Sequence, residues 1–356
     1  MKVFLYSGMQ KMIEKSGVGR AIYHQKKAAA FNDIELVDNL KDADVVHINT
    51  IFPKSYELAK EAHKLGKKVV YHAHSTRQDF RNSYIGSNLV DGLFAWWIMK
   101  CYNSGDIIIT PSIYSKKLLQ SYGITKDIRV LSNGIDTSYY TRNEEMREEF
   151  KKKHKGRKVI MSAGLWIDRK GITDFVELAK RMPQYDFVWY GESNLYTVPA
   201  KIRKAVKTKL PNLSFPGYIS KAELKDAYNN SDLFLFMSKE ETEGIVILEA
   251  LAMKIPTLIR DIPVYEGWLT DSKDVYKAKT LSEFETKITG ILENKLPSVV
   301  EGGYNVAKER DIKEVGKRLK AIYEDALKKY GTDNRKEIVG DNPLDINDTQ
   351  YGNNVL

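Results

Sequence analysis

The sequence predicts an α/β protein made of two doubly wound domains that face each other. The chain has 356 residues, enough for about two domains at roughly 150 residues each. From the first residue onward, short β-branched runs alternate with amphipathic helical stretches, a pattern typical of parallel sheets with crossover helices. The alternation pauses at a charged segment, 141–158, and then begins again. We therefore expect two Rossmann-like domains with a boundary in that segment, and ligands at the carboxyl ends of the strands.

The first domain is expected to span residues 1–140. Each strand candidate is a short run rich in β-branched residues, and amphipathic helical patterns lie between most of them. The strand candidates are 3–7, 34–38, 45–49, 69–74, 107–111 and 128–132, and the helical candidates are 19–32, 56–66, 92–103 and 114–123.

The second domain is expected to span residues 158–308. Its strand candidates are 159–163, 187–190, 213–215, 233–237 and 257–259, with helices near 171–182, 199–209, 221–230 and 244–254. A further helical pattern at about 310–330 is expected to pack back on the first domain. Residues 331–356 are polar and acidic overall, which predicts a mobile tail.

Composition excludes several classes of protein. Hydrophobic residues make up 42% of the chain and charged residues 29%, with 23 Gly and 10 Pro, which is typical of a soluble α/β protein. The single cysteine, Cys101, cannot form an internal disulfide, so we expect a reducing compartment such as the cytoplasm. No stretch approaches the ~20 consecutive apolar residues of a membrane span. Residues 1–7 read as a strand and not as a cleavable signal.

The positive charge and one aromatic helical stretch allow an anionic surface as a partner. The formal net charge is +9, which suits nucleic acid, anionic lipid or a phosphorylated ligand, and charge alone does not choose among them. Residues 1–30 are locally basic. Residues 89–102 are rich in aromatic and aliphatic side chains that could face lipid acyl chains. The alternative is a crossover helix packed on the sheet, which we favour for most of these side chains.

The most informative segment is 239–253, directly after a strand candidate. Its helical part contains one polar side chain, Glu249, so this helix is expected to be buried. A buried carboxylate needs donors, and ligand hydroxyls are one source of them. The helix start near Glu243 and Gly244 offers backbone N–H groups to an anion such as a pyrophosphate. Glu241 lies in the loop at the same end.

Two other interpretations of these carboxylates remain open. The helix could be a capped helix in which Glu249 is satisfied by internal donors. Glu241 and Glu249 could also be the carboxylate pair of a retaining glycosidase, which requires a separation of ~5 to 5.5 Å. One residue lies in a loop and the other more than a turn into the helix, so that separation is not expected.

A second segment of interest, 163–171, follows the first strand candidate of the second domain. Arg169 and Lys170 lie at its strand-to-helix turn, where cations can neutralise phosphate oxygens as a bond to phosphate breaks. The alternative is an exposed basic turn.

In the first domain, glycines and histidines lie where strands and helices meet. Gly17 and Gly19 resemble the start of a G-x-G-x-x-G motif, but Ile22 takes the third position, so the dinucleotide motif is incomplete. The two glycines could admit a ligand close to the backbone or simply form a tight turn. His72 and His74 lack a third zinc ligand at a useful spacing. We expect His72 in the core and His74 in the crevice.

Several of these motifs together resemble glycosyltransferase family 4, the retaining nucleotide-sugar enzymes of the GT-B fold. The most specific match is Glu241-Thr-Glu-Gly-Ile-Val-Ile-Leu-Glu249, which has the family's two glutamates separated by seven residues. Arg169-Lys-Gly171, Ser132-Asn-Gly-Ile-Asp136 and Tyr190-Gly191 also match. The resemblance covers nearly the whole chain to about residue 330.

Two runs narrow the resemblance to bacterial diglycosyldiacylglycerol synthases. They are K-S-G-V-G-R-A at 15–21 and H-x-H-S-T-x-x-D-F-R-N-S-x-I-G-S-N at 72–88. The resemblance implies retaining transfer of a hexose, galactose or glucose, from a UDP-sugar to monoglucosyl-diacylglycerol at the inner face of the cell membrane. The implied partners are a UDP-hexose, a glycolipid and an anionic membrane surface. Nucleic acid, metal ions and cofactors are not expected.

The resemblance also implies roles for single residues. Glu249 would bind the ribose hydroxyls of UDP, Glu241 would bind the donor sugar, and His74 would lie near the reacting carbon. Arg169 and Lys170 would hold the diphosphate. The residues expected to contact the nucleotide sugar through the backbone or by close approach are Gly17, Gly19, Gly191, Thr242, Glu243, Gly244 and Ile245. The sequence departs from the family at Leu165, where an arginine is frequent.

Other functions stay open at this stage. The acceptor could be a soluble glycan, a polysaccharide precursor or a protein. The chain could also be a non-catalytic partner subunit, although the intact pair of Glu241 and Glu249 argues against it. A Rossmann dehydrogenase is disfavoured by the missing third glycine and by the lack of a ribose-binding acid after the second strand beyond Asp38.

Overall fold

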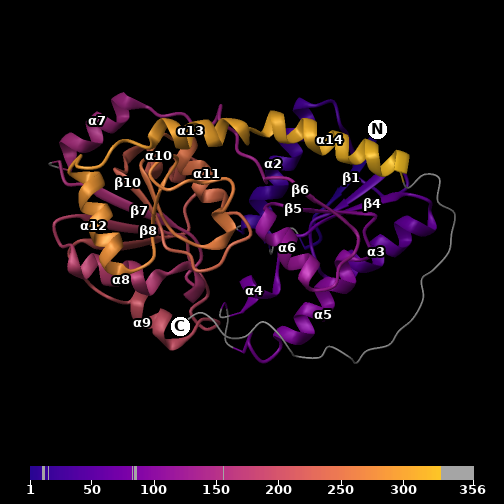
Figure 1. Ribbon diagram of the computed structural model, residues 1–356, viewed down its shortest axis with the longest axis horizontal. Helices are drawn as coiled ribbons and strands as arrows, with labels where there is room; N and C mark the ends of the chain where they lie inside the picture. Colours follow the sequence, from indigo (N-terminus) through magenta and orange to yellow (C-terminus); the bar gives the residue numbers. More distant parts are fainter. Residues whose placement is uncertain (10–12, 15, 82, 84–85, 155, 330–356) are drawn as a thin grey trace.

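The computed structural model describes residues 1–9, 13–14, 16–81, 83, 86–154 and 156–329. The predicted tail at 331–356 lies outside this part. The described chain forms two parallel six-stranded sheets with helices packed around them (Figure 1). The prediction of two doubly wound α/β domains is thereby confirmed.

The first sheet has the strand order β2-β1-β3-β4-β5-β6. All its neighbouring strands are parallel, and β3 and β5 are buried along their whole length, as expected for a sheet covered on both faces. Its strands are β1 (Lys2–Tyr6), β2 (Glu35–Val37), β3 (Val45–Ile48), β4 (Lys68–His72), β5 (Ile107–Thr110) and β6 (Asp127–Val130). The helices between them are α2 (Gly17–Phe31), α3 (Pro53–Lys64), α4 (Arg77–Phe80), α5 (Asp91–Tyr102) and α6 (Ile113–Ser121).

The second sheet has the strand order β12-β11-β10-β7-β8-β9. Its strands are β7 (Val159–Ala163), β8 (Asp186–Tyr190), β9 (Leu213–Gly217), β10 (Leu233–Phe236), β11 (Thr257–Arg260) and β12 (Tyr276–Ala278). Around it lie α7 (Glu144–Lys153), α8 (Ile172–Arg181), α9 (Ala200–Val206), α10 (Lys221–Asn230), α11 (Ile245–Ala252), α12 (Leu281–Leu292) and α13 (Val300–Glu309), with short 3-10 turns η1 (Asp168–Lys170) and η2 (Pro263–Tyr265).

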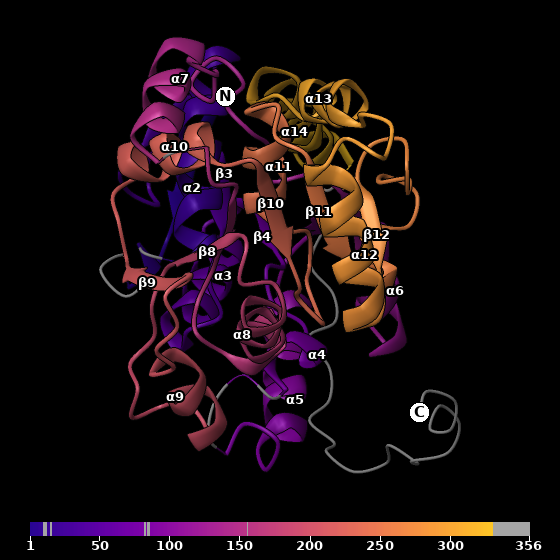
Figure 2. The ribbon, with the colours of Figure 1, turned by 90° about the vertical axis from the view of Figure 1, so that its left-hand side faces the viewer.

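The second domain contains elements that the sequence pattern did not predict. The edge strand β12 is only three residues long, and α12 and α13 follow it. The charged boundary segment contains α7, which is capped by Asn143 and packs near α10 (Figure 2). Acidic residues in the first turn of α7 and lysines in the last turn match the helix dipole. Buried Arg147 pairs with Asp232 at 2.8 Å, so this charged helix is part of the packed domain.

The last described helix, α14 (Ile312–Lys329), leaves the second domain and packs against α2 and the strands β3 and β4 of the first (Figure 1). Tyr323, on this helix, is buried and reaches His47 of β3 with its hydroxyl. A Cβ at Gly316 would meet Ala28 O at 2.8 Å and Asn32 Nδ2 at 2.1 Å. The missing side chain therefore allows α14 to lie close to α2.

Gly316→Ala should destabilise the first domain by about 1 to 2 kcal/mol, because the new Cβ has no room. The loss should exceed the gain of ~1 kcal/mol that alanine brings to a helix interior. Gly92 of α5 is a matched control, because a Cβ there meets nothing within 4 Å. Urea denaturation of both variants checks this: a Gly316→Ala protein as stable as wild type would contradict the close packing.

Candidate active site

The two domains enclose a cleft of about 320 Å³ at the carboxyl ends of their sheets. The first domain contributes the start of α2 and the loops after β4 and β6, and the second contributes the loops after β7, β8 and β10. The lining residues from the first domain are Ser16, Gly17, Val18, Arg20, His74, Ser75, Asp79 and Asn133. Those from the second include Gly164, Leu165, Arg169, Lys170, Tyr190, Gly191, Glu241, Thr242, Gly244, Ile245 and Glu249.

The start of α11 presents backbone donors to the cleft. Gly244 precedes the helix with φ +96°, a conformation that favours glycine, and no side chain caps the helix. Thr242, Gly244 and Ile245 line the cleft here. Uncapped N–H groups and the positive end of the helix dipole can together bind an anionic ligand at this position.

Glu243 points elsewhere. Its buried carboxylate accepts hydrogen bonds from the backbone N–H of Asn133 at 3.0 Å and from its side-chain amide at 2.7 Å. Burial raises the pKa of Glu243, and the donors at Ser132 and Asn133 oppose that rise. The side chain of Glu243 thus joins the two domains, and its carboxylate is occupied by protein donors.

Arg169 and Lys170 lie against Glu241. Lys170 Nζ donates to Glu241 Oε1, and Arg169 Nη1 is 3.7 Å from the same oxygen. Burial raises the pKa of Glu241, but the two cations outweigh it and hold the pKa below its usual value. Burial also lowers the pKa of Lys170, and Glu241 partly offsets this. Arg169 further donates to the carbonyl of Glu240 at 3.0 Å and to Ser83 Oγ of the first domain at 3.2 Å.

Glu249 is buried and held by protein donors. Tyr140 Oη donates to its Oε1 at 2.7 Å, and Tyr228 Oη donates to its Oε2 at 3.0 Å. Arg20 Nε, from α2 of the first domain, lies 3.6 Å from Oε1. The carboxylate therefore has the internal donors that one interpretation of the sequence required. It also lines the cleft, and each oxygen has a second lone pair.

His74 reaches the cleft, and His72 lies in the core, where its ring is stacked on that of His74 with centroids 4.1 Å apart. His74 Nε2 is 2.9 Å from Asn49 Oδ1. Burial lowers the pKa of His74 to about 3, so its imidazole is neutral at physiological pH. A neutral imidazole can donate and accept hydrogen bonds without adding charge to the cleft.

Two further carboxyls, those of Asp79 and Glu240, lie near the cations of this site. Burial raises the pKa of Asp79 to about 6 and that of Glu240 to about 7. Asp79 lines the cleft from the short helix α4, and Glu240 accepts a hydrogen bond from Tyr114 Oη at 3.2 Å. Arg169 opposes both of these rises.

The predicted glycines Gly17, Gly19 and Gly191 have different surroundings. Gly17 lines the cleft, and a Cβ there would meet nothing within 4 Å. Gly19 does not line the cleft: a Cβ there would meet the carbonyl oxygen of Ile13 at 2.4 Å, so its role is close backbone packing. At Gly191, φ is +110° and a Cβ would lie 2.3 Å from Gly164 O, so only glycine fits this part of the cleft wall.

Sequence reasoning missed two residues that line the cleft, Arg20 and Asp79, and two partners of Glu249, Tyr140 and Tyr228. Arg20 lies in the run 15–21 and Asp79 in the run 72–88, but the resemblance gave neither residue a role. Tyr140 and Tyr228 carried no signal, because they reach Glu249 from positions 109 and 21 residues away. Of the two quoted runs, Lys15 and residues 82, 84 and 85 lie outside the described residues.

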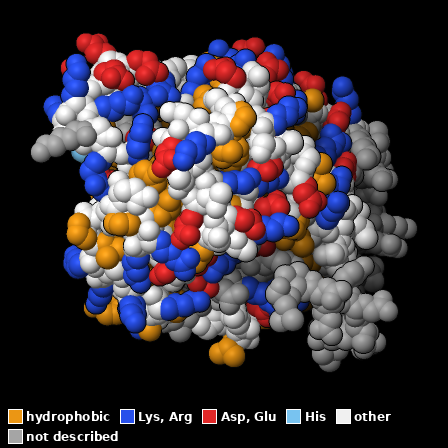
Figure 3. Space-filling view, turned by 60° about the vertical axis from the view of Figure 1, so that its left-hand side comes forward, with side chains coloured by type: hydrophobic (Ala, Val, Ile, Leu, Met, Phe, Trp, Pro, Cys, Tyr) orange, Lys and Arg blue, Asp and Glu red, His pale blue; other side chains and the backbone are white. Residues whose placement is uncertain are grey.

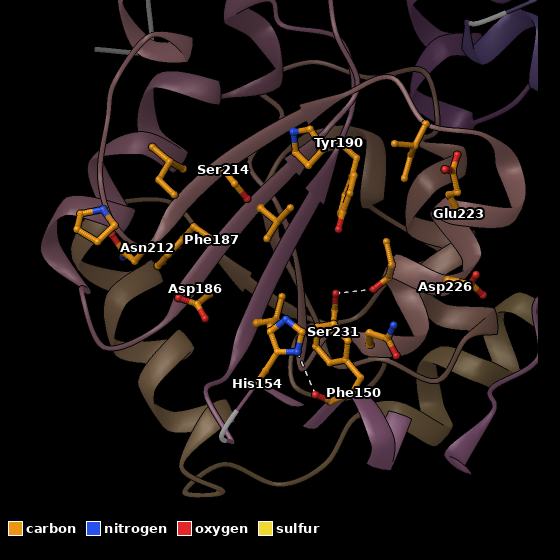
Figure 4. A pocket seen from close by; sticks show the side chains of 18 residues that line it. Phe150, His154, Asp186, Phe187, Tyr190, Asn212, Ser214, Glu223, Asp226 and Ser231 are labelled. Atoms are coloured by element: carbon orange, nitrogen blue, oxygen red, sulfur yellow. Dashed lines mark hydrogen bonds between the residues drawn. The ribbon is translucent and has the colours of Figure 1, made fainter. Parts of the chain in front are cut away.

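A second hollow, of about 600 Å³, lies on the second domain between β8, β9, α7 and α10 (Figure 4). Phe150, Phe187 and Tyr190 form much of its apolar wall, with Glu223 and Asp226 on α10. Except for Tyr190, whose motif contributed to the resemblance, it contains no residue of the predicted site.

On the face drawn in Figure 3, basic and acidic side chains are interspersed.

Two searches of the described residues bear on the kind of site. No group of three or more His, Cys, Asp or Glu side chains there is placed to hold a metal ion. No described helix is both long and apolar enough to cross a membrane.

Two α/β domains face each other across a cleft that contains cations and an uncapped helix end. This arrangement is typical of the GT-B fold of transferases. Residues 13–139 match the model of Glycosyltransferase Family 4, and residues 143–325 match that of Glycosyl transferases group 1. The chain therefore belongs to this glycosyltransferase family and is an enzyme that transfers a sugar.

Two relatives and one solved structure match this chain over most of their length. The processive diacylglycerol alpha-glucosyltransferase of Acholeplasma laidlawii is 39% identical over 92% of this chain and 99% of its own. The alpha-galactosylglucosyldiacylglycerol synthase of Streptococcus pneumoniae is 24% identical over 91% of this chain and 86% of its own. The structure of Anabaena HepE in complex with UDP and glucose has a TM-score of 0.73 at 13% identity, covering 91% of this chain and all of that one.

Glu240→Gln should weaken the dependence of stability on pH. Because the folded protein holds the pKa of Glu240 at about 7 against the ordinary 4.5, the unfolded chain ionises first as pH rises. The free energy of unfolding should therefore fall between about pH 4.5 and pH 7 in the wild type. Part of that fall, about 1 to 3 kcal/mol, should disappear in Glu240→Gln.

Urea denaturation at pH 5 and pH 8 measures this difference. Glu266→Gln, on an exposed side chain of the same domain, is the control and should follow the wild type. Equal losses of stability in wild type and Glu240→Gln would show that this carboxyl does not titrate as described.

Proposed function

We propose that this enzyme transfers a hexose, most simply glucose, from a UDP-sugar to a glucosyl-diacylglycerol with retention of anomeric configuration. The names of two curated relatives support this proposal. The relative that is 39% identical in sequence is named a diacylglycerol alpha-glucosyltransferase, and another is named a galactosylglucosyldiacylglycerol synthase. The alpha products in these names agree with retention, since UDP-glucose is itself an alpha-glycoside. The observation that carries the donor assignment is the cleft in which Glu249, Glu241, two cations and the start of α11 lie together.

The cleft suits each part of a UDP-sugar. The free lone pairs of the buried Glu249 carboxylate can accept hydrogen bonds from two neighbouring ribose hydroxyls. The N–H groups at the start of α11, with Arg169 and Lys170, can bind the diphosphate. Glu241, held beside those cations, and neutral His74 across the cleft can then bind the hexose hydroxyls. Thus the nucleotide contacts come from the second domain and the sugar lies at the boundary with the first.

The proposed reaction is a front-face displacement. The acceptor hydroxyl oxygen forms a bond to the anomeric carbon on the side from which UDP departs, and the bond between that carbon and the phosphate oxygen breaks. The hydroxyl proton passes to an oxygen of the departing diphosphate. Arg169, Lys170 and the α11 N–H groups stabilise the charge that develops there, and in other enzymes one such donor is worth ~3 kcal/mol. Packing of both domains around the site excludes water that would hydrolyse the donor.

An exposed apolar surface on the first domain favours a lipid acceptor. Leu89, Val90, Leu93 and Trp96 are at least 45% exposed, and Leu89 reaches 90%. The opposite side of α5 is packed: Ile98, Cys101 and Tyr102 are buried. We call the four exposed residues the α5 face. A packed helix with such a face can lie at the boundary between headgroups and acyl chains.

Lysines next to the α5 face suit anionic headgroups. Lys100 Nζ lies over the ring of Trp96 at 5.0 Å, and Lys60 Nζ lies over Tyr56 at 4.7 Å. Each lysine near an anionic membrane adds about 1 kcal/mol of attraction. We therefore propose that the enzyme binds peripherally to the inner face of the cell membrane.

The test of the reaction is mass spectrometry of the lipid products. Purified enzyme receives UDP-glucose or UDP-galactose with glucosyl-diacylglycerol in mixed anionic micelles. We expect a dihexosyl lipid from one donor, with an alpha linkage by NMR. Release of UDP without a lipid product would exclude the glycolipid acceptor and favour a soluble glycan or a protein. Absence of turnover with both donors would exclude UDP-glucose and UDP-galactose as donors.

Glu249→Ala should lower kcat/KM for the UDP-sugar by about 100-fold or more, because ribose would lose a charged acceptor and Tyr140 and Tyr228 a buried partner. Glu266→Ala, exposed on the same domain, should retain wild-type turnover. Near-normal turnover by Glu249→Ala would refute the donor assignment. Circular dichroism of both variants separates loss of binding from loss of fold.

Replacing Leu93 and Trp96 together by serine should reduce binding to anionic vesicles at least tenfold, because the interface loses both apolar side chains. Tyr196→Ser is the control, because Tyr196 is 92% exposed on the other domain. Flotation of vesicles containing phosphatidylglycerol measures the bound fraction. Undiminished flotation of the double variant would exclude the α5 face as the membrane contact.

A further inference from the structure

The cleft wall next to the α5 face contains one carboxylate, Asp79, which the donor site described above does not use. Asp79 lies on α4, a four-residue helix between the two domains and next to α5 (Figures 1 and 2). It lines the cleft together with His74 and Ser75. The other charged side chain among the described residues of the first-domain wall, Arg20, is directed at Glu249.

Local hydrogen bonds fix the position of Asp79. Its Oδ1 accepts from the backbone N–H of Thr76 at 3.0 Å, and its own N–H donates to Thr76 Oγ1 at 3.2 Å, which forms a capping box. One oxygen therefore orients the carboxylate. The same side chain lines the cleft, where a ligand can reach it.

Ser83, four residues after Asp79, joins it to one cation of the proposed diphosphate site, Arg169. Ser83 Oγ donates to the carbonyl of Asp79 at 2.7 Å, and Arg169 Nε donates to Ser83 Oγ at 3.2 Å. Asp79 also interacts electrostatically with Arg169, Lys170 and Glu241. A front-face reaction brings the attacking hydroxyl to the side of the leaving diphosphate, so an acceptor must enter this same region.

On its other side, α4 packs against α5, which carries the proposed lipid contact. Phe80, the residue after Asp79, stacks on Phe94 of α5 with ring centroids 4.0 Å apart. Leu93, next to Phe94, belongs to the α5 face. A headgroup that enters from a membrane at the α5 face passes α4 before it reaches the cations.

We propose that Asp79 binds the acceptor, with its carboxylate accepting a hydrogen bond from a hydroxyl of the glycolipid headgroup. This inference rests on the proposed function. The ligand is an uncharged polyhydroxyl headgroup, for which a carboxylate is an acceptor-only partner of fixed position. Asp79 orients the acceptor hydroxyls towards the donor and takes no part in binding UDP. At neutral pH the group is mainly ionised, because its pKa is about 6.

Asp79→Asn tests the proposal with little disturbance of the fold, because the amide oxygen can still accept from Thr76. We expect KM for glucosyl-diacylglycerol to rise about tenfold or more, as for loss of a charge-assisted hydrogen bond. The rise in KM for glucosyl-diacylglycerol should exceed any change in KM for UDP-glucose at least fivefold. Asp79→Glu should recover part of the acceptor affinity.

Asp91→Asn is the matched control. Asp91 is buried at the start of α5, pairs with Arg77 and Arg81 at the two ends of α4, and does not line the cleft. The ion pairs of Asp91 hold the two ends of α4, but the capping box with Thr76 that fixes Asp79 remains, so the acceptor KM of this variant should stay near the wild-type value. An equal rise in Asp91→Asn and Asp79→Asn would show that Asp79 acts only through the order of α4.

The failures of the two proposals can be told apart. If wild-type enzyme makes no glycolipid, the proposed function is wrong. If wild-type enzyme makes the dihexosyl lipid and Asp79→Asn keeps the wild-type acceptor KM, the role of Asp79 is wrong and the function stands. A rise in KM for UDP-glucose instead would move Asp79 to the donor site.

Discussion

Buried carboxylates in the segment before and within α11 require partners, and those partners tie the two domains together. Glu243 is bound by Asn133, Glu249 by Tyr140 and Arg20, and Glu241 by cations one of which reaches Ser83. An unpaired buried charge is far more costly than a single hydrogen bond is favourable. The closed arrangement of the domains is thus linked to the electrostatics of one short segment.

The same constraint shapes substrate binding. Protein donors already stabilise Glu241 and Glu249, so a nucleotide sugar does not have to meet two bare charges. In the proposed complex, its hydroxyls donate to the free lone pairs of these carboxylates, and its anionic oxygens bind Arg169, Lys170 and the start of α11. Such preorganised groups bind with little reorganisation, which is the main source of electrostatic stabilisation in enzyme sites. Leu165, where an arginine was expected from the family, leaves Arg169 and Lys170 as the cations lining this side.

The proposed route of a lipid acceptor depends on a short element. The helix α4 has only four residues, yet its Asp79 lines the cleft and its Phe80 stacks on α5, while Ser83 just beyond it accepts a hydrogen bond from Arg169 of the second domain. This continuity connects the exposed α5 face with the polar cleft over a few residues. An amphiphilic acceptor needs that combination, since its acyl chains stay in the membrane while its headgroup enters the cleft.

The sequence by itself determined the α/β class, the two sheets and the glutamate pattern of the family, because β-branched runs, helix periodicity and local motifs are encoded over short spans. It also predicted Arg169, Lys170 and His74 in the cleft, since residues after parallel strands converge at one edge. It did not predict β12, α12 and α13, and it did not reveal that Gly19 lies close to the backbone of Ile13. Only the tertiary structure decided the partners of Glu249 and Glu243 and the place of Asp79. Those contacts join residues up to 229 positions apart, as in the pair of Arg20 and Glu249, and no local pattern specifies which distant donor meets a buried charge.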